Sequence, residues 1–290
     1  MIYLTGSLNM DMVIESPYMP QEGETVTGGG FITNGGGKGA NQAIACAKLG
    51  GTISMCGSVG DDLFGKTLIE NLKDVGVETS NIGVVNGMPT GIAVIIVTNR
   101  NNRIILDEGA NACLTKESID RFLKGARPSD IYLTQLENPV DVIGYGLQKA
   151  KEKGLFTILN PAPANIEILN YSKYIDLIVP NETELELLGG KGKLFESGIK
   201  KIVTTLGNRG YEIASSQSST VYPCINVEVV DTTAAGDTLC GGLAVGLSEN
   251  MTLEDACAFG SKAASLACTK KGAQQSIPTR YEIYAKKGIE

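Results

Sequence analysis

Short apolar runs alternate with longer amphipathic stretches over the first two thirds of the chain. The short runs are rich in β-branched residues, and in the longer stretches apolar residues recur every three or four positions. Strands and helices are therefore predicted, in turn, at 1–5, 40–49, 53–59, 63–75, 131–136, 140–153, 156–159 and 177–179. This order is typical of βαβ units around a largely parallel sheet, so the pattern predicts an α/β fold.

Two segments break this rhythm. Residues 12–33 and 91–107 alternate polar and apolar positions and carry turn signals, with no helical stretch inside either segment. They are predicted to form a small separate sheet, which is a candidate for a lid.

The last third of the chain follows a different pattern. A strand-like run at 227–230 precedes three helical stretches that begin near Gly236, Leu253 and Thr279, with no clear strand between them. The first of these helices carries small residues that would let it pack closely against its neighbours, namely Gly241, Gly242, Ala244 and Gly246.

Composition is that of an ordinary globular protein. The chain has 290 residues, of which 42% are hydrophobic and 20% charged, so we expect a single domain over residues 1–290. No apolar run is long enough to span a bilayer and no signal sequence is visible, so a cytoplasmic location is expected. The net charge of −7 and the lack of any Lys/Arg block argue against nucleic acid or an anionic membrane as a partner.

Absent residue types and motifs exclude several classes of catalytic and metal site. The seven cysteines include no C-x-x-C pair, which argues against a disulfide framework or a thiolate zinc site. Histidine is absent, which excludes His-based general bases, Ser-His-Asp triads and His-ligated metals. Any acid–base chemistry must therefore come from Asp, Glu, Lys, Tyr or Cys.

A formal Walker A pattern lies at residues 60–67, Gly-Asp-Asp-Leu-Phe-Gly-Lys-Thr, directly after a predicted strand. Read literally, it would make the chain a P-loop NTPase that uses Lys66 and Thr67. Asp61 and Asp62 speak against this interpretation, because they would place two negative charges in a loop that must hold a polyphosphate. The favoured interpretation is a turn whose aspartates cap the helix at 63–75.

A second glycine-rich stretch, residues 34–43, places a cation and an amide at the start of a predicted helix. Its sequence is Asn-Gly-Gly-Gly-Lys-Gly-Ala-Asn-Gln-Ala, in which the cation is Lys38 and the amide is Asn41. Such a helix N-terminus can hold polar or anionic ligands. The alternative is a flexible connection leading out of the lid.

Residues 230–238, Val-Asp-Thr-Thr-Ala-Ala-Gly-Asp-Thr, lead from a strand through small residues into a helix. Backbone N–H groups of Ala235, Gly236 and Asp237 could surround a transferring phosphoryl group there, and Asp237 could take the proton of the acceptor hydroxyl. The residues alone equally allow Asp237 to be a helix cap.

Residues 36–43 and 231–238 resemble the two signature motifs of the ribokinase/phosphofructokinase-B family of sugar kinases. The resemblance spans nearly the whole chain, and further segments follow in the family's order at 6–11, 135–137, 160–163, 180–184, 205–210 and 271–278. It implies a three-layer α/β/α sandwich, with a small β-sheet lid formed by about 12–35 and 91–107.

The resemblance implies an activity, namely transfer of the γ-phosphoryl group of ATP to the O5 hydroxyl of ribose. Asp237 would be the base, and the backbone of Ala234, Ala235 and Gly236 would form the anion hole. Ribose would be held by Asp237 together with Asn9, Asp11, Gly37, Lys38, Asn41 and Glu137, while Ala93 and Ile95 would add apolar contact from the lid. Each polar side chain is also compatible with a role as a cap or a surface group.

The same resemblance assigns the nucleotide and the ions. Asn181 and Glu184 would act on phosphate and on the water shell of Mg²⁺, although both could simply cap a helix after Pro180. The nucleotide would be bordered by Thr205, Leu206, Gly207, Asn208, Arg209 and Gly210, along with Gly236, Asp237 and Ser261. K⁺ would bind to oxygen atoms of Asp231, Thr233, Ala267, Lys270, Gly272 and Ser276, and would order the anion hole.

Three other functions remain open at this point. They are a kinase of the same family acting on 2-deoxyribose, a nucleoside or another sugar, a P-loop NTPase, and a sugar-binding protein without catalysis. The exposed edges of the predicted lid also lead us to expect a homodimer formed through the lid.

Overall fold

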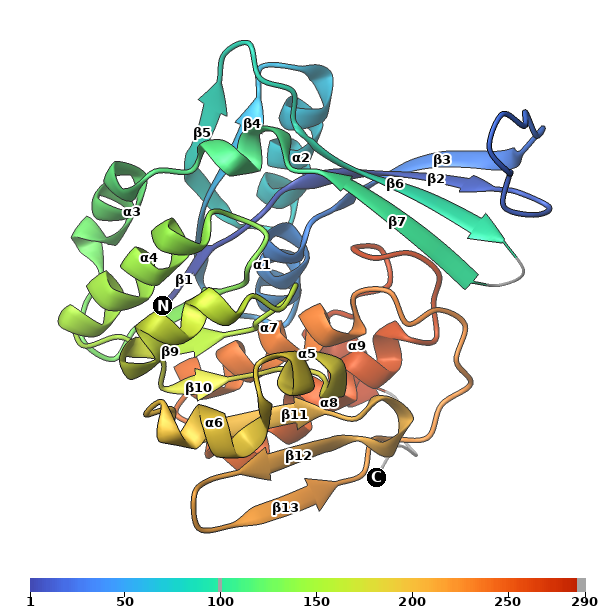
Figure 1. Ribbon diagram of the computed structural model, residues 1–290. Helices are drawn as coiled ribbons and strands as arrows, with labels where there is room; N and C mark the ends of the chain where they lie inside the picture. The colour runs from blue at the N-terminus through green and yellow to red at the C-terminus, as the bar shows by residue number, and fades with distance from the viewer. Residues whose placement is uncertain (99–100, 286–290) are drawn as a thin grey trace.

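The computed structural model describes residues 1–98 and 101–285, which form two sheets and the helices around them (Figure 1). The larger sheet has nine strands in the order β13-β12-β11-β10-β9-β8-β1-β4-β5. Their bounds are β1 (Ile2–Thr5), β4 (Ile53–Gly60), β5 (Glu78–Val85), β8 (Ile131–Thr134), β9 (Phe156–Leu159), β10 (Leu177–Ile178), β11 (Lys201–Thr205), β12 (Tyr211–Ala214) and β13 (Ser219–Tyr222). All pairs from β5 to β11 are parallel, whereas β12 pairs antiparallel with both β11 and β13.

Helices cover both faces of the larger sheet, which gives the predicted three-layer α/β/α arrangement. They are α1 (Lys38–Lys48), α2 (Leu63–Asp74), α3 (Lys116–Phe122), α4 (Val140–Glu152), α5 (Glu182–Leu187), α6 (Gly190–Glu196), α7 (Ala235–Ser248), α8 (Leu253–Ala267) and α9 (Arg280–Ala285). Side chains of β1 alternate between the two faces: Ile2 and Leu4 join the core under α1 and α7, and Tyr3 joins the core under α3 and α4. Both faces of the sheet are therefore buried, as expected of parallel strands.

The small sheet has four strands in the order β3-β2-β6-β7 and projects away from the larger sheet (Figure 1). Its strands are β2 (Asn9–Glu15), β3 (Gly29–Gly36), β6 (Gly91–Thr98) and β7 (Asn101–Asp107). Both segments predicted for it are therefore strands, apart from residues 99–100, which lie outside the described part. The first strand begins earlier than predicted, at Asn9, and residues 16–28 connect β2 to β3 without forming a strand.

Two predicted strands differ from the structure. Residues 227–230 are not a strand, because the Val230 N–H bonds to the Cys268 carbonyl near the end of α8 instead of to a neighbouring strand. The strand predicted at 131–136 ends at Thr134, since the Leu136 N–H bonds to the Ala162 carbonyl in a loop. Alternating apolar residues predict an extended backbone at both places, but pairing requires a partner strand in register.

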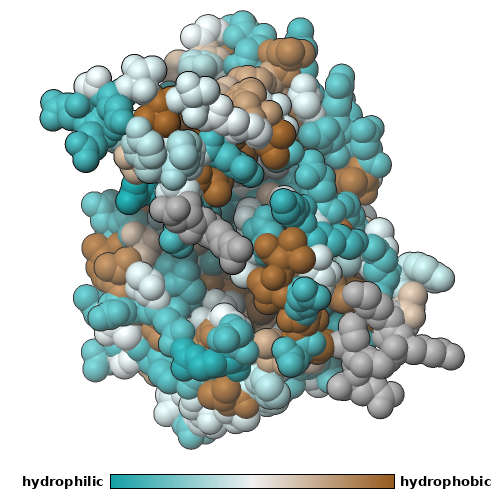
Figure 2. All heavy atoms as spheres, turned by 90° about the vertical axis from the view of Figure 1, so that its right-hand side faces the viewer, coloured by the Kyte–Doolittle hydropathy of each residue, from teal (hydrophilic) through white to brown (hydrophobic). Residues whose placement is uncertain are grey.

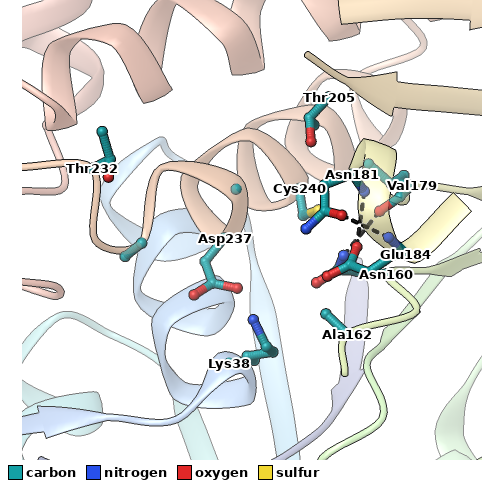
Figure 3. A pocket seen from close by; sticks show the side chains of 12 residues that line it. Lys38, Asn160, Ala162, Val179, Asn181, Glu184, Thr205, Thr232, Asp237 and Cys240 are labelled. Atoms are coloured by element: carbon teal, nitrogen blue, oxygen red, sulfur yellow. Dashed lines mark hydrogen bonds between the residues drawn. The ribbon is translucent and has the colours of Figure 1, made fainter. Parts of the chain in front are cut away.

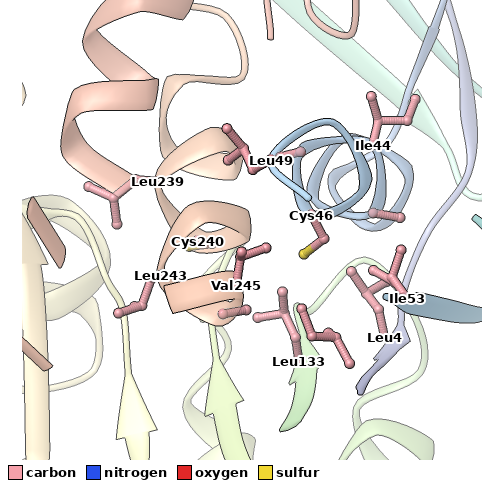
Figure 4. Packing of buried hydrophobic residues seen from close by; sticks show 14 of the residues in the cluster. Leu4, Ile44, Cys46, Leu49, Ile53, Leu133, Leu239, Cys240, Leu243 and Val245 are labelled. Atoms are coloured by element: carbon pink, nitrogen blue, oxygen red, sulfur yellow. The ribbon is translucent and has the colours of Figure 1, made fainter. Parts of the chain in front are cut away.

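Close packing of α7 was predicted from its small residues and is observed. A β-carbon added at Gly241 would lie 2.5 Å from the Ala45 Cβ of α1, and one added at Gly242 would lie 2.6 Å from the Gly260 Cα of α8. Figure 4 shows the apolar side chains of α1 and α7 meeting above the sheet strands. This contact brings the beginnings of two helices from opposite ends of the sequence side by side.

The surface mixes polar and apolar side chains, as Figure 2 shows for the side that lies to the right in Figure 1. Large apolar side chains of the small sheet are exposed on β3 and β7, namely Phe31, Ile32, Ile104, Ile105 and Leu106. Within residues 1–98 and 101–285, no helix combines the length and the apolar character that crossing a membrane would require.

Candidate active site

Asp237 lies in the first turn of α7 and is 7% exposed. The turn opens with Ala234, whose φ of 58° lies in the left-handed region, and no side chain caps the helix. The carboxylate of Asp237 instead accepts hydrogen bonds from two amides of α1, Asn41 Nδ2 to Oδ2 at 3.0 Å and Gln42 Nε2 to Oδ1 at 3.0 Å. The side chain is therefore held towards α1 rather than used to close its own helix.

The N-terminus of α7 opens into a cavity of about 280 Å³ (Figure 3). Of the three N–H groups predicted to be available, those of Gly236 and Asp237 have no hydrogen-bond partner within the described residues, whereas that of Ala235 donates to the Thr232 carbonyl at 3.2 Å. A helix N-terminus with unpaired N–H groups carries partial positive charge, so it suits an anion. The cavity is lined by Lys38, Asn160, Ala162, Val179, Asn181, Glu184, Thr205, Thr232, Ala234, Gly236, Asp237 and Cys240.

Lys38 brings a cation to the same cavity from the start of α1 (Figure 3). It follows Gly37, whose φ of 86° is unfavourable for other residues and whose added β-carbon would lie 2.8 Å from the backbone nitrogen of Asn9. Burial works to lower the pKa of Lys38, but the carboxylates of Asp237 and Glu137 outweigh it and leave the pKa raised. Lys38 therefore stays charged at neutral pH.

A set of polar side chains lies beside Asp237, where the small sheet meets the larger one. Glu137 accepts from the Ser7 hydroxyl at 2.6 Å and from the Lys38 N–H at 3.1 Å. Asp11 lies on β2, and burial, followed by the charges of Glu137 and Asp237, raises its pKa to about 7. These contacts place the predicted sugar-binding carboxylates next to the predicted base.

The small sheet brings two apolar side chains to this region. Asp11 on β2 is the register partner of Ala93 on β6, and Val13 is the partner of Ile95 two positions further along. Because residues two apart in a strand share a face, Ala93 and Ile95 lie on the same face of the small sheet as Asp11.

Asn181 and Glu184 form a capping box at the start of α5. The Glu184 N–H donates to Asn181 Oδ1 at 2.8 Å, and the Asn181 N–H donates to Glu184 Oε2 at 2.8 Å. Both residues also line the cavity at α7, opposite Lys38 (Figure 3). Burial raises the pKa of Glu184, against the opposing effects of the Asn181 N–H and of Lys38. The helix cap therefore presents a carboxylate to the same cavity.

A second cavity, of about 520 Å³, adjoins the first and shares Thr205, Thr232 and Gly236 with it. Thr205, Gly207, Asn208, Gly210 and Ser261 line it as predicted, whereas Leu206 and Arg209 are not among its lining residues in the described part. Arg209 instead makes an ion pair with Glu182 at 2.5 Å. The other lining residues are mostly apolar or small and include Cys224, Ile225, Val227, Val229, Leu239, Ala264, Ser265 and Cys268.

Asp231 anchors the loop that leads into α7. Its Oδ1 accepts from the N–H and the hydroxyl of Thr233 at 2.9 and 2.6 Å, and its Oδ2 accepts from the Gly272 N–H at 2.9 Å. Burial acts to raise the pKa of Asp231, but these hydrogen bonds outweigh it and leave the pKa lowered. The other predicted K⁺ ligands follow on the adjoining segment: the Ala267 carbonyl accepts from the Lys270 N–H, and the buried Ser276 hydroxyl donates to the Ala273 carbonyl.

The model of the pfkB family carbohydrate kinases matches residues 1–280 of the chain. The chain belongs to this family. A ribokinase of Haemophilus influenzae is 38% identical to it over 290 residues, covering 96% of this chain and 95% of the relative. A deoxyribokinase of Salmonella typhi is 34% identical, with 96% and 95% covered. The structure of an Arabidopsis thaliana ribokinase complexed with ribose and ATP has a TM-score of 0.85 at 31% identity, with 98% and 97% covered.

Membership of the pfkB family agrees with what the structure shows at residues 60–67, where a Walker loop does not form. Asp62 caps α2 by accepting from the Gly65 N–H at 2.8 Å, and Thr90 donates to it through both N–H and hydroxyl. Thr67 donates its hydroxyl to the Leu63 carbonyl, within the helix itself. The interpretation of this stretch as a capped helix is therefore confirmed.

Two polar residues near the candidate site, Gln42 and Asn111, were not assigned from the sequence. Gln42 stands beside Asn41 in the glycine-rich motif, so its position was a signal that could have been used. Asn111 lies in a segment without any motif, yet it donates to Asn9 Oδ1 at 2.7 Å and accepts from the Leu8 N–H at 2.9 Å. Only the folded chain places Asn111 next to the start of the small sheet.

Proposed function

We propose that this pfkB carbohydrate kinase is an ATP-dependent ribokinase, which converts D-ribose and ATP to D-ribose 5-phosphate and ADP. One observation carries the proposal. The carboxylate of Asp237 stands between partly buried acids and buried amides suited to sugar hydroxyls and a helix N-terminus open to a cavity of about 280 Å³. The named activities of the ribokinase relatives support the same assignment, as does the likeness to the Arabidopsis ribokinase that was solved with ribose and ATP.

In the proposed reaction, Asp237 accepts the proton of the ribose O5 hydroxyl as that oxygen attacks the γ-phosphorus. The bond between O5 and the γ-phosphorus forms, the bond to the bridging oxygen of the β-phosphate breaks, and ADP carries away the released charge. The N–H groups of Gly236 and Asp237 stabilise the transferring group, and Lys38 offsets negative charge in the cavity. Ala234 and Ala235 shape the turn that exposes these N–H groups.

Sugar recognition would rest on groups whose hydrogen-bonding capacity matches vicinal hydroxyls. Asn9, Asp11, Asn41 and Glu137 supply amide and carboxylate groups, and each ribose hydroxyl that is missing from a competitor would leave one of them unpaired in a buried place. Ala93 and Ile95 would cover the apolar side of the ring as the small sheet closes as a lid.

Mg²⁺ fits the oxygen groups at the edge of the phosphate cavity. Glu184 and Asn181 supply a carboxylate and an amide there, and Mg²⁺ prefers oxygen ligands, often with water in between. Within the described residues, no cluster of three acidic, His or Cys side chains could hold a metal by itself, which is consistent with an ion shared with ATP phosphates. When bound, Mg²⁺ would neutralise charge on the transferring phosphates.

K⁺ fits the loop around Asp231. The lowered pKa of Asp231 keeps an ionised carboxylate there, and Thr233, Ala267, Lys270, Gly272 and Ser276 supply further oxygen atoms on the adjoining segments. Because this loop leads directly into Ala234, an ion held there would stiffen the anion hole without touching substrate. The rate of ADP release is therefore expected to rise with K⁺ concentration. The Asp231→Ala variant is expected to lose this dependence on K⁺.

Two further proposals concern the setting of the enzyme. A homodimer would cover the apolar side chains exposed on β3 and β7 and would pair the open edges of the small sheet. A cytoplasmic location is supported by the cysteines, all seven of which are unpaired. Analytical ultracentrifugation tests the first: a monomer at micromolar concentration would refute it.

The proposed function is tested by following ADP release from MgATP with ribose, 2-deoxyribose, fructose and adenosine, each with and without K⁺. Turnover highest on ribose and stimulated by K⁺ would support a ribokinase. Turnover highest on 2-deoxyribose would replace the substrate and keep the mechanism, an outcome worth testing because of the likeness to a deoxyribokinase. Binding of ribose without ADP release would refute the proposal in favour of a sugar-binding protein.

A further inference from the structure

Gln42 links the carboxylate of Asp237 to the larger sheet. Its side-chain nitrogen donates to Asp237 Oδ1 at 3.0 Å and to Asn160 Oδ1 at 3.1 Å, so both of its protons are used. Asn160 follows β9, and its own amide nitrogen donates to the Val179 carbonyl at 2.9 Å, just beyond β10. Through these bonds, the position of the base is tied to the ends of two sheet strands.

A third side chain fixes which way round the Gln42 amide lies. Gln135 Nε2 donates to Gln42 Oε1, and an ionised carboxylate only accepts hydrogen bonds, so the nitrogen of Gln42 faces Asp237. Gln42 is completely buried and is not among the described residues that line the two cavities. It therefore reaches the first cavity only through its partners Asp237 and Asn160, both of which line it.

We propose that Gln42 is a positioning residue for phosphoryl transfer: it holds the carboxylate of Asp237 towards the acceptor hydroxyl. This inference rests on the proposed function. Asn41 occupies one oxygen of the carboxylate and Gln42 the other, so without Gln42 one buried oxygen would have no donor. The carboxylate would then rotate towards another partner or take up a proton.

Asp237 is surrounded by more carboxylates than cations, so the hydrogen bond donated by Gln42 is important in addition to that donated by Asn41. The titratable groups that surround it come from β2, α1, the loop after β8, α5 and α7 itself, and they are Asp11, Lys38, Glu137, Glu184 and Cys240. Lys38 is the cation in this group, and the three carboxylates repel the negative charge of Asp237. The amides of Asn41 and Gln42 oppose that effect, because an N–H donor is satisfied best by an ionised carboxylate.

The inference is tested by the rate of a single turnover at saturating ribose and ATP, measured from pH 5.5 to pH 9. Two variants are compared with the wild type: Gln42→Met, which keeps the length without a donor, and Gln42→Glu, which is nearly isosteric. For Gln42→Met the rate should fall roughly 10- to 100-fold. Its acidic limb should move to higher pH, because a donor to the carboxylate is lost. For Gln42→Glu the limb should move further, because two carboxylates then face each other.

Thr157→Val is the matched control. Thr157 is also fully buried on β9, its hydroxyl contacts the Tyr174 carbonyl at 2.6 Å and Asp176 Oδ2 at 3.1 Å, and it is not among the described residues that line the two cavities. It should lower the melting temperature and leave the pH profile unchanged.

The possible outcomes distinguish failure of the positioning role of Gln42 from failure of the proposed kinase function. Wild-type rates and limbs in both Gln42 variants, or lowered rates with a wild-type acidic limb, would overturn the positioning role, because a purely structural residue would behave in this way. If Gln42→Met does not fold, Gln42→Glu decides alone by the same criterion. Absence of phosphoryl transfer in the wild type would instead overturn the proposed function.

Discussion

The N-termini of α2 and α7 look alike in sequence and differ in the folded protein. Each has a glycine and an aspartate close to its start, and each was a candidate for binding phosphate. At α2 the Asp62 side chain occupies the Gly65 N–H and is itself held by Thr90, so the helix end is closed. At α7 the residue before the helix is Ala234, which has no polar side chain, and the helix end opens into the cavity.

This difference shows what turns a helix start into an anion site. The partial charge of the N-terminus is common to all helices. It becomes available to a ligand only where no side chain of the protein satisfies the first N–H groups. A glycine-rich sequence indicates only that the backbone can form a tight turn. The side chain of the N-cap residue decides whether the first N–H groups of the helix remain available to a ligand.

The largest expected contrast between the two helix ends is in catalysis. Asp237→Asn removes the proposed base and should lower kcat by roughly 10²- to 10⁴-fold. Lys66→Ala, at the α2 end, should leave kcat unchanged, because Lys66 is exposed and belongs to a closed helix start. Both are measured by ADP release with ribose. An inactive Lys66→Ala together with an active Asp237→Asn would reverse the assignment of the two ends.

Glycine substitutions should affect the two ends in opposite ways. A β-carbon added at Gly236 meets nothing within 4 Å, so Gly236→Val should fold normally and fill the anion hole, lowering kcat about 100-fold. A β-carbon at Gly65 would lie 2.4 Å from the Gly60 carbonyl oxygen, so Gly65→Ala should destabilise the fold by about 1–3 kcal/mol. Chemical denaturation and ADP release are measured on both variants. A Gly236→Val enzyme with normal kcat would show that these N–H groups do not act on the phosphate.

The third contrast between the two helix ends is in their response to pH. Below its pKa, the ionised fraction of a carboxyl group falls about tenfold for each pH unit. Asp11, beside the α7 end, has its pKa raised to about 7 by burial and then by Glu137 and Asp237. In the proposed function its ionised form would accept sugar hydroxyls, so the KM for ribose should rise as the pH falls below 7 and should level off above it. Asp11→Asn should raise KM and flatten this dependence, as measured by initial rates from pH 5.5 to 8.5.

The α2 end should not respond over the same range. Burial acts to raise the pKa of Asp62, but hydrogen bonds from Thr90 and Gly65 outweigh it and leave the pKa lowered. A carboxyl with a lowered folded-state pKa stabilises the fold above its unfolded value and loses that effect only as the pH falls through the folded value. The contribution of this cap is therefore constant between pH 5.5 and 8.5. A stability that varied with the Asp62 side chain in that range would contradict this account.

The smallest expected effect concerns the α2 cap itself. Asp62→Ala removes the N-cap hydrogen bond and should cost about 1 kcal/mol. For a chain of this size the melting temperature should fall by roughly 2–4 °C. The kcat should not change, because the closed helix end takes no part in the reaction. Thermal unfolding with and without MgATP checks the cost, and a change in kcat beyond twofold would reopen the question of a site at α2.

Much of the architecture could be predicted from local pattern, because parallel strands and the helices between them carry strong periodicity. Most strands and helices between β1 and β10, the small sheet and the packing of α7 followed from such signals, whereas β5, α3, α5, α6 and β11 were not predicted. The edge strands β12 and β13 have only four residues each and were missed. Residues 227–230 look like a strand but lack a partner, and pairing is a property of the fold rather than of the segment.

In the candidate site, too, residues within local motifs could be predicted, whereas contacts between distant parts of the sequence could not. Asp237, Lys38 and Asn41 stand in motifs whose residue types suggest chemistry directly. Asn111 could not be found in this way, since its contact with Asn9 joins positions 102 residues apart. The contact between Gln42 and Asp237 spans 195 residues, so the sequence names both partners without pairing them.

That contact between α1 and α7 has a consequence for the order of synthesis. The amides at 41 and 42 leave the ribosome long before the carboxylate at 237, and the face of α1 that receives Gly241 has nothing to cover it until α7 is made. A nascent chain can therefore assemble much of its sheet while the reaction centre is still missing. Catalytic competence should appear late and abruptly during translation, once the chain has passed α7 and that helix has docked.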